Sequence, residues 1–363
     1  MKIYVVTVTY GNRFHLLKQV IDGVLSEDVA KIIVVDNNSN PESRDKLGEY
    51  EKQLNGKIKV LYLDDNYGSA GGFKRGLEEA YNDVECEFIW LLDDDNVPEK
   101  KALEKLIYAY KYLGENQNNI LVSFRESRQV NVKAIYLGEQ VGYKTNSFTS
   151  FHILYWLKSR INSSIKYKNT KNYCIVRSQV AAYGGLFLAK TVINEVGYPD
   201  EDFFIYADDH DWTLRMTKRG LNIYLCSESR LKDIDWTWTA TREKNSSCES
   251  SDREYKVYYT IRNHVYLDKN FIKNKYVYYI NMIIKFFYFY FLHPYLKTEN
   301  AIKRIKIIVK AIKDGLKGKL GNTFNKVSME NENFCGKKIE SDFLNTKRKR
   351  GGNHDEGQAN VQS

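Results

Sequence analysis

The 363-residue sequence predicts an α/β sandwich, in which helices cover both faces of a β-sheet, followed by a helical and basic C-terminal extension. Two observations predict the sandwich. Apolar runs typical of buried strands alternate with segments of helical spacing over the first hundred residues. Polar side chains follow several of these runs, as they do at the ligand-binding edge of open α/β folds. The extension is predicted from helical spacing combined with many lysines.

The expected elements alternate regularly. The predicted strands are residues 3–9, 31–35, 58–63 and 88–92, and the predicted helices are residues 14–25, a polar segment after Pro41, and residues 72–81. Helices of this length between strands imply a parallel sheet with right-handed crossovers. Residues 126–172 show no clear period, and we expect an irregular lid or acceptor-binding insertion. Regular patterns return at residues 183–189, 209–219 (helix) and 222–226 (strand), and the chain is mostly helical from Tyr255.

Charge and cysteine content limit the functional classes. Residues 1–272 carry 37 basic and 38 acidic residues, whereas residues 273–350 carry 18 and 6. This asymmetry predicts an anionic surface as partner of the extension. Nucleic acid is not expected, because no nucleic-acid-binding motif accompanies the charge. Five cysteines without CxxC spacing, and no leader before the first strand, predict a reducing cytoplasm without a zinc site or disulfide framework.

Three consecutive aspartates follow the fourth predicted strand. Asp93, Asp94 and Asp95 repel one another, and a hard cation shared with a phosphate-bearing substrate would explain their proximity. Alternate residues of an extended chain point the same way, so Asp93 and Asp95 are expected to share one ion. The alternative is an acidic turn that caps the next helix. GxxxxGK[ST] and GxGxxG do not follow the first strand, which disfavours P-loop NTPases and dinucleotide-binding dehydrogenases.

Two further segments indicate chemistry. The glycine-rich residues 66–72 approach a predicted helix N-terminus, where free N–H groups and the helix dipole bind anions. The alternative there is a tight turn. The cluster Asp208-Asp209-His210-Asp211 opens another helix, with Gly184-Gly185 upstream to permit close approach of a ligand. Acids at a helix start are often only caps, but three in four positions predict a general base.

These motifs resemble family 2 inverting glycosyltransferases over residues 1 to about 267. The resemblance is carried by residues 6–13, Val35-Asp36-Asn37-Asn38-Ser39, the aspartate triplet, and residues 208–211 with Arg215. It implies a GT-A (nucleotide-diphospho-sugar transferase) fold and a nucleotide-diphosphate sugar donor. It also implies that Asp93 and Asp95 form a DxD metal site and that Asp209 is the catalytic base, with Asp208 beside it.

The resemblance extends to binding residues. The expected donor-binding residues are Thr9, Tyr10, Asn12, Arg13, Asp36, Asn38, Asn66, Gly68, Gly71, Gly72, Lys74 and Asp94, and the expected acceptor-binding residues are Gly184, Gly185, Asp211, Trp236 and Trp238. Relatives often place a metal-binding His in a Trp-His pair, where this chain has Asp235-Trp236. If Asp235 replaces that His, the site is all oxygen and favours Mn²⁺ or Mg²⁺; otherwise the third ligand is open.

The donor sugar is predicted from two segments. Residues 66–76 resemble galactofuranosyltransferases, and residues 258–264 resemble a Tyr-Tyr…Arg-Asn segment found there and in rhamnosyltransferases. UDP-galactofuranose is therefore the first expectation and dTDP-rhamnose the second. A metal-bound diphosphate leaves while Asp209 takes the proton of an acceptor hydroxyl, so one displacement inverts the anomeric carbon.

The extension is predicted to lie on a membrane surface. Residues 276–292 are apolar and aromatic but too short and too polar at the centre to span a bilayer. An apolar stripe between residues 302 and 320, flanked by lysines, is typical of a helix lying on anionic lipid. The alternative is a helix packed on the catalytic domain with a solvated lysine face.

Together these predictions describe a metal-dependent inverting glycosyltransferase, peripheral on the inner face of a bacterial plasma membrane, that builds surface polysaccharide on a lipid-linked saccharide acceptor. The expected parts are a catalytic domain (1–254), a helical extension (255–320) and a disordered basic tail (321–363). A sugar-nucleotide nucleotidyltransferase is a rival enzyme interpretation. A non-catalytic protein that binds anionic surfaces is the rival of another class.

Overall fold

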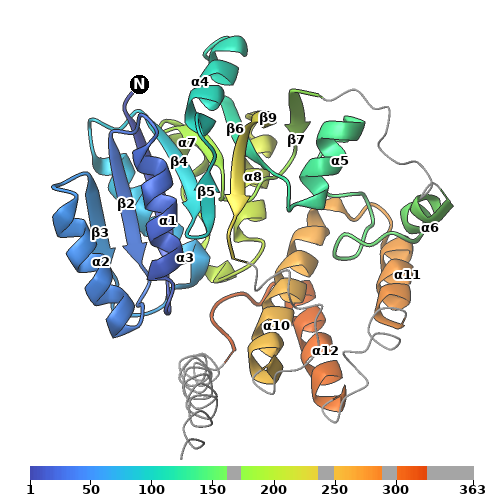
Figure 1. The fold of residues 1–363 in the computed structure, drawn as a ribbon. Coiled ribbons are helices and arrows are strands. Elements are labelled where there is room, and N and C mark those ends of the chain that lie inside the picture. Colours follow the sequence, from blue (N-terminus) through green and yellow to red (C-terminus); the bar gives the residue numbers. More distant parts are fainter. Residues whose placement is uncertain (162–172, 236–248, 288–300, 325–363) are drawn as a thin grey trace, which may run out of the picture.

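The computed structural model describes residues 1–161, 173–235, 249–287 and 301–324. Within these residues, nine strands form one twisted sheet with helices on both faces, and the C-terminal helices stand beside one end of it (Figure 1). The order across the sheet is β3-β2-β1-β4-β8-β6-β9-β5, and β7 pairs with β9 outside this path. The α/β sandwich predicted from the sequence is confirmed.

The first four strands are parallel, as predicted. They are β1 (Ile3–Thr9), β2 (Lys31–Asp36), β3 (Ile58–Tyr62) and β4 (Phe88–Asp93). In the register of the sheet, Thr9 is paired with Asp36, and Val8 is paired with Asp93. The polar ends of three strands therefore meet at one edge.

The other half of the sheet is mixed, which differs from the parallel sheet expected. β8 runs antiparallel to both β4 and β6, while β9 is parallel to β6 and antiparallel to β5 and β7. These strands are β5 (Asn96–Pro98), β6 (Asn119–Arg125), β7 (Ile175–Ser178), β8 (Leu186–Ala189) and β9 (Asn222–Asp233). Because β6 is parallel to its neighbour β9, Arg125 ends on the same side of the sheet as the carboxyl end of β9.

Amphipathic helices cover each face. On one face, Leu77 and Trp212 join the core with α3 (Gly68–Asn82), α5 (Gln129–Leu137), α7 (Val192–Val196) and α8 (Asp208–Lys218). On the other, Leu17 and Leu106 join a second core with α1 (Phe14–Leu25), α2 (Pro41–Gln53) and α4 (Ala102–Tyr112). α5 and α6 (Ile153–Ile161) fall inside residues 126–172, so the irregular insertion expected there is wrong for these two stretches.

The C-terminal helices have an apolar core of their own. They are α10 (Glu249–Asp268), α11 (Lys275–Lys285) and α12 (Ala301–Lys317). Ile308 and Ala311 of α12 are fully buried together with Tyr258 and Val265 of α10. The middle of the predicted stripe, at Ile308, therefore packs on α10, which is a helix of the extension and not the catalytic domain that the alternative interpretation named. Ile302 (73%) and Val309 (47%) are exposed.

No helix in the described part of the chain is long and apolar enough to cross a membrane. The tail from residue 325 and the apolar residues 288–292 lie outside the described residues. Residues 321–324, predicted to belong to the tail, pack against α10, where Phe324 N–H donates to Tyr259 Oη at 3.2 Å.

Candidate active site

A cavity of about 830 Å³ opens where the carboxyl ends of β1, β2 and β4 meet the N-termini of α3 and α8. Residues of α10 and of the segment after α12 also line it, so the C-terminal helices contribute to the same space. The predicted site residues that line the cavity are Tyr10, Arg13, Asn38, Asn66, Gly68, Asp93, Asp94, Asp95, Asp208, Asp209 and Asp235.

The guanidinium of Arg13 lies among three carboxylates. Its Nη2 is 2.8 Å from Asp94 Oδ1 and 3.3 Å from Asp95 Oδ2, and its Nη1 is 2.6 Å from Asp235 Oδ2. Asp94 also accepts a hydrogen bond of 2.8 Å from the hydroxyl of Thr9. These charge-assisted bonds fix the triplet against the end of β1.

Asp93 is held by a buried arginine that the sequence analysis did not single out. Arg125 Nη1 lies 3.1 Å from Asp93 Oδ2 and 2.9 Å from Asn96 Oδ1. A side chain at Gly184 would collide with this network, because its Cβ would lie 2.0 Å from Asn96 Oδ1 and 2.5 Å from Asp93 Oδ2. Gly184 therefore makes room for Asp93 and its partners.

Asp93 and Asp95 suit a hard divalent cation. Burial, followed by the charges of Asp93 and Asp94, raises the pKa of Asp95 to about 7, and burial also raises the pKa of Asp93. A cation would relieve this repulsion, and carboxylate oxygens are ligands that Mg²⁺ and Mn²⁺ prefer. Among the described residues, however, no three Asp, Glu, His or Cys side chains form a complete metal site. Phosphate oxygens or water would have to complete the shell, as is usual for Mg²⁺.

Asp208 and Asp209 are neighbours in different surroundings. Asp208 is buried and accepts a hydrogen bond of 2.7 Å from Ser69 Oγ, and its burial, reinforced by the charge of Asp209, raises its pKa. Asp209 is half-buried and lines the cavity, and its negative charge contributes to the raised pKa of Asp93. Both carboxylates line the cavity, and Asp209, which is the more exposed, is the better placed of the two to reach a hydroxyl of a bound molecule.

The turn before α3 is fixed by a side chain from the end of β2. Asn37 Nδ2 donates to Asn66 Oδ1 at 3.1 Å and to Gly68 O at 2.9 Å, while Tyr67 N–H donates to Asn37 Oδ1 at 2.9 Å. Gly68 has φ +71°, a conformation that favours glycine. The N-terminus of α3 thus borders the cavity, with a dipole that favours anions.

Other predicted residues have structural partners outside the cavity wall. Asp36 is buried and ion-paired with Arg44. Gly72 packs α3 on β1, because a Cβ there would lie 2.6 Å from Val8 Cγ1. Lys74 is ion-paired with Glu201. The predicted residues not among those lining the cavity are Thr9, Asn12, Asp36, Gly71, Gly72, Lys74, Gly184, Gly185 and Asp211, while Trp236 and Trp238 lie outside the described residues.

α10 presents a neutral histidine to the cavity. His264 Nδ1 lies 2.8 Å from the carbonyl oxygen of Thr260, and a carbonyl only accepts, so Nδ1 carries the proton. Burial lowers the pKa of His264 to about 4, which leaves Nε2 as an acceptor at neutral pH. Tyr143 Oη, beside this ring, lies 3.1 Å from His210 Nδ1.

Arg125, Ser69 and His264 were not predicted as site residues. Arg125 is the last residue of β6, and because the sequence did not predict this strand, it did not indicate that Arg125 lies at the cavity edge of the sheet. Ser69 lies inside the glycine-rich segment, and His264 ends the Tyr-Tyr…Arg-Asn segment, so both stood next to signals already noted.

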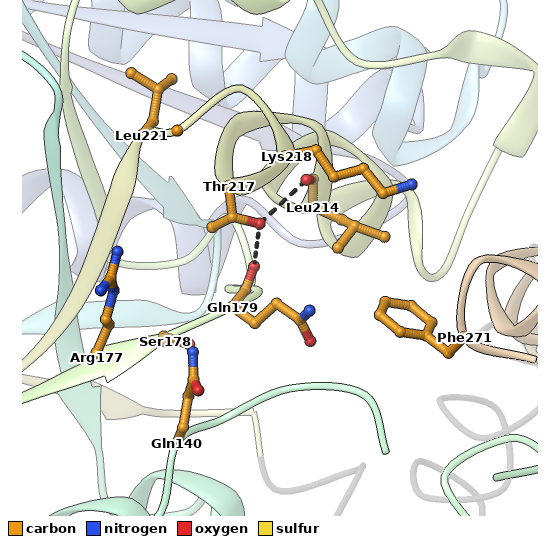
Figure 2. Close-up of a pocket in the computed structure, with 10 residues that line it drawn as sticks. Gln140, Arg177, Ser178, Gln179, Leu214, Thr217, Lys218, Leu221 and Phe271 are labelled. Carbon is orange, nitrogen blue, oxygen red and sulfur yellow. Dashed lines mark hydrogen bonds between the residues drawn. The ribbon is translucent and has the colours of Figure 1, made fainter. Parts of the chain in front are cut away.

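A second cavity, of about 320 Å³, lies at the C-terminal end of α8 (Figure 2). Thr217 Oγ1 donates to Gln179 O and to Leu214 O, both at 3.1 Å. None of the described residues lining this cavity is acidic, so it offers neither a base nor a carboxylate ligand for a metal. The first cavity is therefore the candidate active site.

Comparisons with known proteins indicate a similarity to glycosyltransferases. Residues 4–177 match the sequence profile of Glycosyl transferase family 2. The low-salt glycan biosynthesis hexosyltransferase Agl10 of Haloferax volcanii is 22% identical over 200 residues, which cover 54% of this chain and 57% of that protein. The dTDP-rhamnosyl transferase RfbF of Shigella flexneri is 24% identical over 237 residues, covering 63% of this chain and 68% of that protein. The match thus spans little more than half of the archaeal relative.

Among solved structures, GalNAc-T7 with UDP, GalNAc and Mn²⁺ has a TM-score of 0.53 at 16% identity, covering 87% of this chain and 56% of that one. At this identity the likeness shows the fold alone, which is the GT-A glycosyltransferase fold. The profile match over residues 4–177, the curated relatives and the fold agree, and the chain is similar to family 2 glycosyltransferases.

Proposed function

We propose that this protein is a glycosyltransferase that moves a hexose from a nucleotide-diphosphate donor to a hydroxyl of a lipid-linked glycan, with inversion and with Mn²⁺ or Mg²⁺ as cofactor. The observation that carries the proposal is the cavity shared by the carboxylates that end β4, the N-terminus of α3 and Asp209. These parts offer a place for a cation, a place for an anion and a base. The names of two relatives, a glycan biosynthesis hexosyltransferase and a rhamnosyl transferase, support glycan synthesis.

The donor diphosphate lies between the aspartate triplet and the turn before α3. Asp93 and Asp95 hold the cation, which when bound supplies a Lewis acid for the leaving diphosphate. Arg125 keeps Asp93 in orientation through its 3.1 Å hydrogen bond, and Arg13 keeps Asp94 against β1. Because these arginines are already paired with carboxylates, they position the acidic groups before any substrate arrives.

The acceptor enters from the side of α8 and α10. Asp209 takes the proton of the acceptor hydroxyl, whose oxygen attacks the anomeric carbon from the face opposite the diphosphate. One direct displacement inverts that carbon, so no enzyme nucleophile is required. His264 accepts a hydrogen bond through Nε2 from a second hydroxyl of the acceptor sugar, because its Nδ1 is committed to Thr260 O.

The nucleotide is a uridine or thymidine diphosphate. UDP-galactofuranose remains the first sugar donor suggested by residues 66–76 and 258–264, and the name of the Shigella flexneri relative favours dTDP-rhamnose as the second. The side of the cavity formed by the strand ends is polar, which suits either sugar. The donor panel described below distinguishes the two.

Docking on an anionic membrane surface is proposed for α11, since α10 covers the middle of the α12 stripe. α11 exposes Tyr276 (70%), Ile280 (52%) and Ile283 (50%), and the neighbouring Phe287 is 57% exposed. The exposed Lys273 and Lys275 at its N-terminal end supply the positive charge that anionic lipid attracts. A peripheral enzyme on the inner face of the membrane would meet a lipid-linked acceptor there.

A donor panel tests the proposal. Purified protein is mixed with Mn²⁺ and single nucleotide sugars, and thermal shift and released nucleoside diphosphate are measured, because ligand binding to the native state raises its apparent stability. Release of UDP or dTDP in the presence of a glycan acceptor supports transfer. Release of pyrophosphate instead would show a nucleotidyltransferase.

The metal site is tested by Asp95→Ala, with Asp28→Ala as control. Asp28 is exposed and stands at the opposite end of β2 from the cavity. We expect Asp95→Ala to abolish turnover while its melting temperature stays near that of the wild type, and Asp28→Ala to be fully active. Full turnover of Asp95→Ala in EDTA would remove the metal from the proposal.

A further inference from the structure

A strained loop leads directly to the proposed base. Phe204 has φ +64° and ψ −66°, and Ile205 N–H donates to Phe203 O at 2.8 Å, which is the rare γ-turn with a positive φ. Tyr206 (φ +66°) and Ala207 (φ +61°) also lie in the left-handed region that side chains disfavour. Such a backbone persists only where its surroundings hold it. We call residues 203–207 the base loop.

Asn263 of α10 binds this loop at three points. Its Nδ2 donates to Phe203 O at 3.0 Å, to Ile205 O at 2.8 Å and to Tyr206 O at 2.7 Å. Its Oδ1 accepts a hydrogen bond of 2.7 Å from Arg262 Nε. The reverse orientation of the amide would set an oxygen against three carbonyls, so the network fixes the amide.

Arg262 is completely buried, and each of its five N–H groups has an acceptor. The acceptors are Asn263 Oδ1 (2.7 Å), Gly321 O (2.6 Å), Thr323 Oγ1 (3.3 Å), Asp202 O (3.3 Å) and Phe203 O (3.0 Å). None of these five is a carboxylate. Three of the five acceptors are backbone carbonyls of separate chain segments. Because no carboxylate is bonded to it, this buried guanidinium holds chain segments together and does not neutralise an anion.

The remaining carbonyls of this region are also bonded. Phe204 O accepts from Ala70 N of α3 at 3.3 Å, and Asp202 O accepts from Gly321 N at 2.6 Å. Ala207 O accepts from Asp211 N at 2.9 Å, which begins the helix that carries Asp209. The base loop and the adjoining Asp202 are thus hydrogen-bonded to α3, to α10 and to the segment after α12. Every carbonyl of residues 202–207 has a hydrogen-bond donor.

We propose that Arg262 and Asn263 are positioning residues that hold the base loop in its strained conformation and thereby aim Asp209 at the acceptor hydroxyl. The inference rests on the proposed function for the role of Asp209 as base. On this proposal α10 is part of the catalytic unit, because two of its residues, more than fifty positions from Asp209 in the chain, determine how the carboxylate of Asp209 is oriented.

Hydrogen exchange tests the hold on the loop without any substrate. Asn263→Ser removes both amide N–H groups, and Leu106→Ala, in the buried core on the other face of the sheet, serves as the destabilised control. We expect peptides covering residues 203–212 to exchange at least about 10-fold faster in Asn263→Ser and at the wild-type rate in Leu106→Ala. Equal exchange in all three proteins would overturn the proposal. If Asn263→Ser does not fold, Arg262→Lys, which keeps the charge and loses the planar fork, replaces it.

Turnover then separates positioning from stability. With UDP as the binding probe, Asn263→Ser should keep the wild-type UDP affinity and donor KM, while kcat for transfer falls about 10²-fold, as expected for a displacement of about 1 Å at a catalytic group. An unchanged kcat with a loosened loop, or an equal fall of kcat in Leu106→Ala below both melting temperatures, would refute the role. Absence of transfer by the wild type with every donor would refute the proposed function, whereas the exchange result would still decide whether the loop is held.

Discussion

Replacing Gly184 by alanine is a sharp test of how the active site is assembled. An ideal Cβ at this position would lie 2.0 Å from Asn96 Oδ1, 2.5 Å from Asp93 Oδ2 and 2.9 Å from Arg125 Nη1, where ordinary contacts begin at 3.4 Å. Both oxygens must therefore retreat, Asp93 by roughly 1 Å. Arg125 is buried and bonded to both, so it cannot follow without losing its own partners.

This displacement acts on activity more than on stability. Overpacking of this kind typically costs about 1–3 kcal/mol of unfolding free energy, which a domain of this size survives. If Asp93 holds a catalytic cation as proposed, a shift of about 1 Å in its carboxylate costs on the order of 10²-fold in rate. We therefore expect Gly184→Ala to fold, to melt a few degrees lower, and to need more Mn²⁺ for half-maximal transfer.

The assay is a Mn²⁺ titration of transfer, with Gly48→Ala as control. Gly48 lies in α2, where an added Cβ would meet only Tyr62 Oη at 3.3 Å, and alanine favours a helix. Wild-type rate and Mn²⁺ dependence in Gly184→Ala would show that Asp93 does not depend on this space, and the role assigned to Gly184 would then be wrong.

Three further predictions concern the base, a buried pair and the surface. Asp209→Asn should keep the affinity for UDP and lower kcat by roughly 10²–10⁴-fold. Loss of UDP binding would show that Asp209 belongs to the donor site. A loss of rate of this size in Asp208→Asn alone would show that Asp208 is the base. Burial raises the pKa of Asp268 to about 7 despite the nearby Lys285, so between pH 4 and 7 the native state binds a proton that the unfolded chain has lost. The melting temperature of the wild type should therefore fall relative to that of Asp268→Asn as the pH rises from 4 to 7. Parallel melting curves for the two proteins would contradict this. Binding to anionic vesicles should weaken in high salt and in a variant with polar residues at Ile280 and Ile283; binding resistant to both would exclude α11 as the docking surface.

The strands that carry the site were predictable because their signal is local. Apolar runs ending in Thr9, Asp36 and Asp93 mark the carboxyl ends of β1, β2 and β4, and parallel pairing brings those ends together. The order of these motifs along the chain also predicted the similarity of residues 4–177 to family 2 glycosyltransferases. What the sequence could not assign is which polar groups pair with one another, since Arg13 lies 222 positions from Asp235.

The expectations for α12 and for two glycines show one limit of the sequence. A helical stripe such as that of α12 shows that one face of the helix is apolar, but it does not show what packs against that face. In the structure α10 packs against Ile308 and Ala311 of this face. Gly72 and Gly184 illustrate the same limit, because a missing side chain leaves space for the donor, for a neighbouring strand or for a catalytic carboxylate, and only the fold decides. Gly72 faces Val8 and Gly184 faces Asp93.

The placement of α10 connects the proposed membrane-docking surface with the loop before Asp209. α11 follows α10 after the short helix η3 (Lys269–Phe271), and Ile153 N–H, at the start of α6, donates to Asn281 Oδ1 of α11 at 3.0 Å. Asn263 of α10 meanwhile binds the base loop. If α11 docks as proposed, the height of Asp209 above the lipid surface is set within these packed helices. A lipid-linked hydroxyl of fixed reach would then meet the base without a separate hinge.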